Sequence, residues 1–401
     1  MKWILKDENL SVPIKSWCAE VEKGAMEQAR NLACHPVVKQ WVALMPDCHS
    51  GYGMPIGGVI AADNAVLPSA VGVDIGCGMI AVRTNLPAEK LSAMSVRRAI
   101  QERLKKRIPV GEGVAHEQMQ QWEGFDEYLD KNGIVCDFPN AFDRRNLGTL
   151  GGGNHFIELQ KSDDGYVWLM IHSGSRNLGQ RIENHYQNVA KKLNASFRVQ
   201  LPDSELAFLP MDIQEGQDYV RDMMFALSYA FENRHRMMTV FKETLLDAFP
   251  ETVFLEEINI HHNYAAEEKH FGRQFIVHRK GATSARKGEI GIIPGSMGTA
   301  SYIVRGLGNP ESFMSCSHGA GRSLSRIAAS QKLTVAECDE SMKGIVFEPW
   351  GTYKGFTKRH KGLVDLSEAP LAYKPIDEVI AAEADLVETL VRLTPLAVLK
   401  G

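Results

Sequence analysis

The stretch GGVIAADNAVLPSAVGVDIGCGMIAVRT, residues 57–84, indicates how this chain is built. Short runs of β-branched and small apolar residues alternate with glycines, a pattern typical of short strands joined by tight turns. Similar glycine-rich stretches recur from about residue 45 to about residue 320. Any site must therefore be assembled from distant segments, which predicts one integrated α+β domain over residues 1–401 rather than a string of modules.

Other segments have a helical pattern. Residues 218–249 place apolar side chains at a spacing near 3.6 and contain neither glycine nor proline, which predicts a long helix. The stretches 377–393 and 89–107 are predicted to form two further helices.

The composition is that of an ordinary globular protein, with 44% hydrophobic and 23% charged residues among 401. The formal net charge of −4 excludes a globally basic nucleic-acid binder, so any nucleic acid must bind at a local patch. Seven cysteines without CxxC spacing indicate a reducing compartment. No signal peptide and no membrane-spanning run are apparent, and a cytoplasmic protein is expected.

The motif GVDIGCG places a carboxylate, Asp74, three residues before a thiol, Cys77. An isolated pair of this kind is most often a buried cysteine near a surface aspartate. Several histidines in similar strand-end contexts favour a different interpretation, in which Cys77, Asp74 and imidazoles from other segments bind a divalent ion. A thiolate can also bridge two metals, which suits two-metal catalysis.

Histidines in three other motifs are candidates for that site. His155, in GGGNHFIE, is either a core histidine or a ligand, while His172 leaves an apolar run into the turn HSGSR. Arg176 in that turn could hold a phosphate or form a surface salt bridge. His261 and His262 are adjacent, so in a strand they point to opposite faces and one of them serves a given site.

His318, in SCSHGAGR, has small neighbours that leave its imidazole open to a bulky electrophile. It could act as a covalent nucleophile, as a general base or as an outer support. The stretch PGSMGTAS, residues 294–301, could present N–H and hydroxyl groups to a phosphate or a base, although it is no Walker A loop. His49 and His278 are left open. The remaining histidines are expected in helical or polar surface contexts; they are His35, His116, His185, His235, His270 and His360.

Taken in order, the motifs resemble the RtcB family of RNA ligases. The resemblance runs from MPDCHSGYGMPIGGVI through AVGVDIGCGM, LGTLGGGNHFIE, HSGSR, EEINIHHNY, RKGATSAR, GIIPGSMGTASYIVRGLGN and SFMSCSHGAGR to EAPLAYKPID and the terminal LKG. It implies a single α+β domain with mixed sheets, flanking helices and a metal-lined cleft. It also implies that an RNA 3′-phosphate or 2′,3′-cyclic phosphate end is joined to a 5′-hydroxyl end with GTP and manganese.

The resemblance also implies roles for individual residues. One Mn²⁺ would be held by Asp74, Cys77 and His155, and the second by Cys77, His172 and His262. His318 would attack the α-phosphate of GTP and carry GMP, and Arg176 would contact RNA or a phosphate. The implied guanylate-binding residues are Asn154, His155, Phe156, Glu158, His262, Asn263, Pro294, Gly295, Ser296, Met297, Ser301, His318, Gly319, Ala320, Gly321, Tyr373 and Lys400.

Two other functions compete with ligation. A metal phosphodiesterase that only opens cyclic phosphates would need the metal ligands but not His318, and a non-catalytic RNA-repair subunit would need neither. The segment 350–361 is locally basic with interleaved aromatics, and it is either a base-stacking surface or a solvated loop. The sequence leaves open the RNA substrate (tRNA halves or damaged RNA), the metal used in the cell, any activating partner and the oligomeric state.

Overall fold

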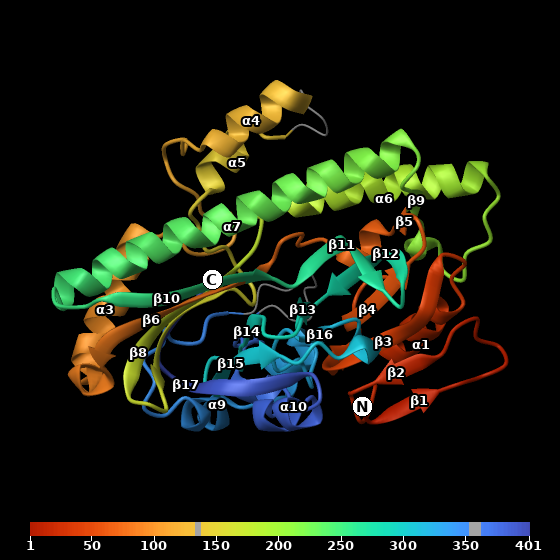
Figure 1. Cartoon of the computed structure of the whole chain (residues 1–401). Helices are drawn as coiled ribbons and strands as arrows, with labels where there is room; N and C mark the ends of the chain where they lie inside the picture. Colours follow the sequence, from red (N-terminus) through yellow and green to blue (C-terminus); the bar gives the residue numbers. More distant parts are fainter. Residues whose placement is uncertain (133–137, 353–361) are drawn as a thin grey trace.

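Two β-sheets form the frame of the protein, and the computed structural model describes residues 1–132, 138–352 and 362–401 (Figure 1). The first sheet has the strand order β1-β2-β3-β4-β12-β11, in which β2 and β3 are parallel and the other neighbours antiparallel. Its strands, in that order, are Trp3–Leu5, Ile14–Ser16, Val38–His49, Ile56–Ala62, Arg273–Lys280 and Asn263–His270.

The second sheet is antiparallel and has the order β10-β6-β8-β7-β17-β15-β14. Its first and last strands, β10 and β14, also contact each other, so the sheet curls toward a barrel. In that order the strands are Phe254–His261, Gly78–Pro87, Tyr166–Ser173, Phe156–Ser162, Val387–Lys400, Ser301–Gly306 and Ile290–Ile293.

Helices cover the sheets, and two short strand pairs join the connecting segments. The pairs are β5 with β9 (Ala65–Val66 with Leu209–Pro210) and β13 with β16 (Ala282–Ser284 with Ser315–Ser317). The α-helices α1 to α10 are Lys23–Ala33, Pro68–Val71, Met94–Arg107, Glu123–Asn132, Ala141–Asn146, Leu178–Ser196, Gln214–Ala248, Arg326–Lys332, Val335–Ser341 and Ile376–Ala382. Short 3₁₀ helices occupy Ala88–Leu91, Ser204–Leu206, Pro310–Ser312 and Pro370–Ala372.

The long helix α7 confirms the prediction for 218–249, and it begins a few residues earlier, at Gln214. It lies beside α6 across one side of the molecule, while α9 and α10 lie on the opposite side (Figure 1). Its buried stripe, which includes Tyr219, Met223, Ala226 and Met237, packs toward β6, β8 and β10. The helix therefore spans the backs of the strands that carry several candidate site residues.

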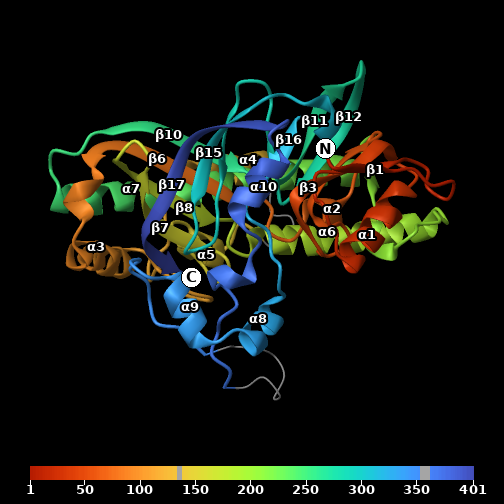
Figure 2. The same ribbon diagram turned by 90° about the horizontal axis from the view of Figure 1, so that it is seen from below.

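The prediction of one helix over 377–393 is wrong in its second half. Helix α10 ends at Ala382, and the chain turns at Glu383–Leu386 into β17. The residues after the turn include the β-branched Val387, Thr389 and Val391, which pack well on a pleated surface. Figure 2 shows β17 as a long strand, and it pairs with β15 on one edge and β7 on the other. Pairing with β15 and β7 thus determined the structure of residues 387–393, although their apolar residues have a helical spacing.

The helix predicted over 89–107 is confirmed from Met94 onward and is preceded by a 3₁₀ turn. The α+β expectation also holds, with a mixed sheet in one half and a curled antiparallel sheet in the other. Within the described ranges, none of the helices is both long and apolar enough to span a bilayer.

The chain passes from one sheet to the other at His262. Strand β10 of the second sheet ends at His261, and β11 of the first sheet begins at Asn263. The backbone N–H of His262 donates to the Cys77 carbonyl at 2.9 Å, directly before β6 begins. The candidate metal ligands therefore lie where the two sheets meet.

Candidate functional site

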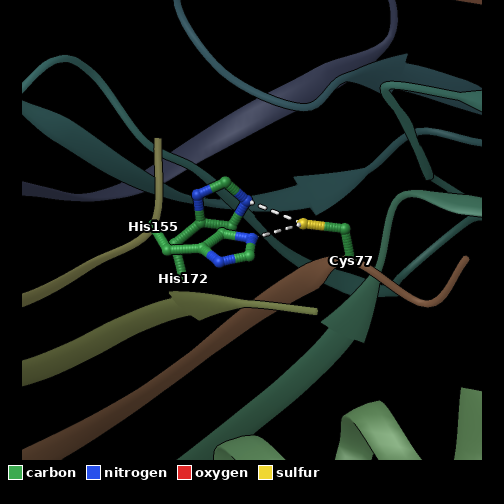
Figure 3. A group of neighbouring side chains, drawn as sticks. All are labelled: Cys77, His155 and His172. Atoms are coloured by element: carbon green, nitrogen blue, oxygen red, sulfur yellow. Dashed lines mark hydrogen bonds between the residues drawn. The ribbon is translucent and has the colours of Figure 1, made fainter. Parts of the chain in front are cut away.

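Cys77, His155 and His172 direct their side chains toward one another (Figure 3). The Cys77 sulfur lies 3.2 Å from Nε2 of His172 and 3.5 Å from Nε2 of His155. Nε2 of His262 lies 3.4 Å from Nε2 of His172, and Oδ2 of Asp74 lies 3.2 Å from Nε2 of His155. The five residues that the sequence suggested as metal ligands thus form a single cluster, which we call the Cys/His cluster.

Two glycines allow the segments of this cluster to approach. A Cβ on Gly78 would lie only 2.0 Å from the carbonyl oxygen of Ile260, and one on Gly174 would lie 2.3 Å from the Asp74 carboxylate. Both distances are far inside van der Waals contact. A larger residue would therefore separate β6 from β10 or displace Asp74 from the cluster.

Backbone carbonyls set the proton positions on two of the rings. Nδ1 of His155 contacts the Leu150 carbonyl at 3.1 Å, and Nδ1 of His172 contacts the Asn154 carbonyl at 3.2 Å. Because a carbonyl only accepts, each Nδ1 carries the proton and each Nε2 directs a lone pair toward Cys77. This is the usual arrangement of metal-binding histidines.

The electrostatics of the cluster also fit a cation. Burial lowers the pKa of His172 and His262 well below the usual range, so both rings are neutral and able to bind a metal. Burial raises the pKa of the Cys77 thiol well above its usual range, which a bound cation would reverse by stabilising the thiolate. Oδ2 of Asp74 faces the unprotonated Nε2 of His155 at 3.2 Å, and a cation bound between them would stabilise both. A thiol, a carboxylate and three imidazoles suit a transition-metal ion.

His318 lies between the Cys/His cluster and Asp47. Its ring centroid is 4.8 Å from that of His262, and its Nδ1 is 2.6 Å from Oδ2 of Asp47. The backbone N–H of His318 donates to the same carboxylate oxygen at 3.1 Å. Because this carboxylate accepts, the ring proton sits on Nδ1 and Nε2 keeps its lone pair. A nucleophilic or basic imidazole requires this tautomer.

Asp47 was not among the predicted site residues, although it lies in the motif MPDCHSGYG. Lys374 holds it in place from the far side, since Nζ donates to the carbonyls of Pro46 at 3.1 Å and Cys48 at 2.8 Å. These two carbonyls belong to the residues that flank Asp47. Nothing in the local sequence signals this contact, because Lys374 and Asp47 lie more than 300 residues apart.

A cleft of about 510 Å³ opens beside His318, a volume typical of small-molecule sites. His49, left open by the sequence, lies on its wall. Many of the predicted guanylate-binding residues line it as well, namely Asn154, Phe156, Pro294, Gly295, Ser296, Met297, His318, Gly319, Ala320, Gly321, Tyr373 and Lys400.

The other predicted guanylate-binding residues lie behind the cleft wall or in the Cys/His cluster. Glu158 is buried and accepts from Nε2 of Gln160 at 2.6 Å, and the same nitrogen donates to Ser301 at 3.2 Å. Asn263 donates to the Asp74 carbonyl at 3.0 Å. The full set outside the lining is His155, Glu158, His262, Asn263 and Ser301.

Glu368 is a cleft residue that the sequence did not single out, although it stands in EAPLAYKPID. Its carboxylate accepts from the Tyr373 hydroxyl at 2.6 Å, Nζ of Lys400 at 3.0 Å and Nη1 of Arg322 at 3.2 Å. Burial would raise the pKa of Glu368, but Lys400 and Arg322 hold it below its usual value. The carboxylate therefore orients one wall of the cleft.

Arg176 lies half-buried close to the Cys/His cluster, where Nε donates to Oγ1 of Thr149 at 3.2 Å. Gly151 makes room for it, because a Cβ there would lie 1.9 Å from the guanidinium. Among the ion pairs of the described residues none includes Arg176, so the structure does not support a surface salt bridge.

Two histidines expected at the surface are buried instead. His35 is 1% exposed and contacts the Leu206 carbonyl, and His270 is 3% exposed and pairs with Glu268. Each finds a polar partner that local sequence does not reveal. His261 and His262 diverge as predicted, since His261 turns away from the cluster toward Arg234. In the segment 350–361, residues 353–361 lie outside the described residues.

The chain was compared with known proteins. The model of the family described as tRNA-splicing ligase RtcB matches residues 28–401. An RNA-splicing ligase RtcB from Escherichia coli is 38% identical over 99% of both chains. The tRNA-splicing ligases RtcB of Thermococcus kodakarensis and Pyrobaculum aerophilum are 33% and 32% identical, each over 94% of this chain and 91% of their own. The family match covers nearly the whole chain, and the fold brings the distant motifs together in one cleft. This chain therefore belongs to the RtcB family.

Proposed function

We propose that this chain is an RNA ligase that joins an RNA 3′-phosphate or 2′,3′-cyclic phosphate end to a 5′-hydroxyl end, using GTP and Mn²⁺. The observation that carries the proposal is the position of His318, with Nδ1 bound to the buried Asp47 and the ring next to the Cys/His cluster. A phosphodiesterase or a passive RNA-binding subunit has no need for a histidine held in this way. The relatives in Escherichia coli and the archaea carry names of splicing ligases, which supports the same reaction class.

In the proposed first step, Nε2 of His318 attacks the α-phosphorus of GTP. A P–N bond forms, the bond between the α-phosphorus and the bridging oxygen breaks, and pyrophosphate leaves. The attacking ring becomes positively charged, and the Asp47 carboxylate stabilises that charge through the proton on Nδ1. The small residues Gly319 and Ala320 leave space for the phosphates beside the ring.

Two Mn²⁺ ions are the proposed metals of the Cys/His cluster. Asp74, Cys77 and His155 would hold one, and Cys77, His172 and His262 the other. When bound, such ions neutralise phosphate charge and polarise the reacting oxygens. The inward-directed Nε2 lone pairs and the buried thiol are the features that support a cation here.

The base of GTP is proposed to bind where Tyr373 and Lys400 meet. Glu368 holds both side chains, so the carboxylate determines their orientation in the cleft. Phe156 and Met297 line the cleft too and offer apolar surface to a flat ring.

Transfer of GMP from His318 to an RNA 3′-phosphate would solve a chemical problem. A terminal phosphate repels nucleophiles and lacks a good leaving group, whereas the guanylylated end carries a pyrophosphate linkage. The 5′-hydroxyl oxygen then attacks the RNA phosphorus, a new phosphodiester forms and GMP leaves. A cyclic phosphate would first be opened by water to the 3′-phosphate. Arg176 is proposed to hold an RNA phosphate, and tRNA halves or damaged RNA in the cytoplasm are the proposed substrates.

Radiolabelled GTP tests the proposal. Incubation with Mn²⁺ should label the protein with acid-labile GMP, and a 3′-phosphate RNA with a 5′-hydroxyl partner should be ligated. His318→Ala should abolish both results. Opening of cyclic phosphates without a GMP adduct would establish the phosphodiesterase instead, and no reaction together with RNA binding would establish the passive subunit.

A further inference from the structure

Arg234 is a fully buried arginine on α7, directly beneath the Cys/His cluster. Its guanidinium contacts four groups, which come from the ends of β8 and β10 and from the residue just before Cys77. Nη1 donates to the carbonyls of Gly76 at 2.9 Å and Ser173 at 3.0 Å. Nε donates to Oδ1 of Asn259 at 2.8 Å, and Nη2 lies 3.1 Å from Nδ1 of His261, which also contacts the Gly76 carbonyl at 3.0 Å.

Three of these four groups belong to residues that stand next to candidate metal ligands in the chain. Gly76 precedes Cys77, Ser173 follows His172, and His261 precedes His262. One side chain thus ties together the ends of β8 and β10 and the start of β6.

The charge of Arg234 is also unusual for its setting. A buried guanidinium is costly unless an anion accompanies it. All four groups that it contacts are neutral, and among the ion pairs between described residues none includes Arg234. Burial lowers its pKa to about 10, so it stays protonated near neutrality. The anionic groups that act on Arg234 are the Cys77 sulfur, when it is ionised, and Asp74, and both belong to the cluster.

We propose that Arg234 is the positioning residue of the metal site. It aligns Cys77, His172 and His262 through their chain neighbours, and its fixed positive charge balances the anionic ligands from the helix side. The inference rests on the metal site of the proposed function. In this inference, α7 fixes the distances between the three chain segments that carry Cys77, His172 and His262.

Metal binding by folded protein tests this inference independently of ligation. Wild type, Arg234→Met and Arg234→Lys are titrated with Mn²⁺ by calorimetry and with Co²⁺ by near-ultraviolet absorption, where a cobalt–thiolate bond gives a charge-transfer band. Loss of an outer-shell partner typically weakens metal binding about 10- to 100-fold, and the same loss is expected for Arg234→Met. The thiolate band should weaken or shift in parallel.

Arg234→Lys separates charge from geometry, because lysine keeps the charge but cannot reach all four groups. Its affinity should fall between those of wild type and Arg234→Met. The matched control is Arg236→Met on the same helix, since Arg236 bonds Glu232 and the Gln121 carbonyl away from the cluster. This control should bind both ions like wild type.

Wild-type affinity and an unchanged band in Arg234→Lys, or in a folded Arg234→Met, would overturn the inference. Should Arg234→Met not fold, Arg234→Lys alone decides by the same measurements. Failure of the wild-type chain to bind either ion would overturn the proposed metal site itself, which distinguishes the two failures.

Discussion

Replacement of Asp47 tests the chemistry of His318 most directly, and the structure predicts an order among variants. Oδ2 of Asp47 accepts both from Nδ1 of His318 and from its backbone N–H. In Asp47→Asn the amide oxygen should stay at this position, because both donors need an acceptor there. The Nδ1 proton is then retained and only the negative charge is lost.

The magnitudes follow from these contacts. A hydrogen bond to a charged group contributes about 1.5–3 kcal/mol and a neutral one about 0.5–1.5 kcal/mol. The difference, about 1–1.5 kcal/mol, corresponds to roughly tenfold slower GMP–histidine formation in Asp47→Asn. Asp47→Ala loses the charged hydrogen bond to Nδ1 and leaves the backbone N–H of His318 without its acceptor. Together these losses cost about 3–5 kcal/mol, which corresponds to roughly thousandfold slower GMP–histidine formation.

The assay is single-turnover labelling with radiolabelled GTP at saturating Mn²⁺, on variants whose circular dichroism matches wild type. Asp164→Asn, which alters an exposed pair with Arg83, serves as the control and should react like wild type. An Asp47→Ala rate within tenfold of wild type would refute the role of Asp47. Equal rates for the Asn and Ala variants would refute the argument that the shared oxygen preserves the tautomer.

Three further outcomes are expected. Cys77→Ser should abolish the near-ultraviolet cobalt–thiolate band and weaken Mn²⁺ binding at least about tenfold, as measured by calorimetry; an unchanged band would exclude the thiol as a ligand. Lys374→Met should slow GMP–histidine formation about tenfold in the labelling assay while GTP affinity is unchanged. The reason is that Nζ of Lys374 contacts the carbonyls that flank Asp47 and the Cys18 sulfur, and Lys374 does not line the cleft. A selective loss of GTP affinity would contradict this. Burial lowers the pKa of His278 to about 3, so between pH 6.5 and 3 the unfolded chain binds a proton that the folded one does not. Stability should therefore fall as pH drops below 6.5, by up to about 1.4 kcal/mol per pH unit, and urea melts at pH 7.5 and 5.5 should show a smaller fall for His278→Gln.

Most of the candidate site residues could be predicted because they lie in short, distinctive sequence motifs. Asp74, Cys77 and His318 stand among glycines and serines, where few structural roles compete for such residues. The sequence did not reveal Asp47, Glu368 and Lys374, because each acts on residues far away in the chain. Neither an aspartate near the end of a strand nor a glutamate or lysine in a loop has a local signature. The predicted surface positions of His35 and His270 were wrong for the same reason, because the burial of a histidine depends on which segments pack against it.

The sequence by itself determined the α+β class, a long helix predicted over 218–249, the set of candidate ligands and the resemblance to one family, because local periodicity and motif order carry that information. Only the tertiary structure decided that Cys77 meets partners 78 and 95 residues away, that Asp47 supports a histidine 271 residues away, and that residues 387–400 pair as a strand. Side-chain convergence and strand pairing depend on distances through space, and a chain specifies those distances only once its sheets have packed.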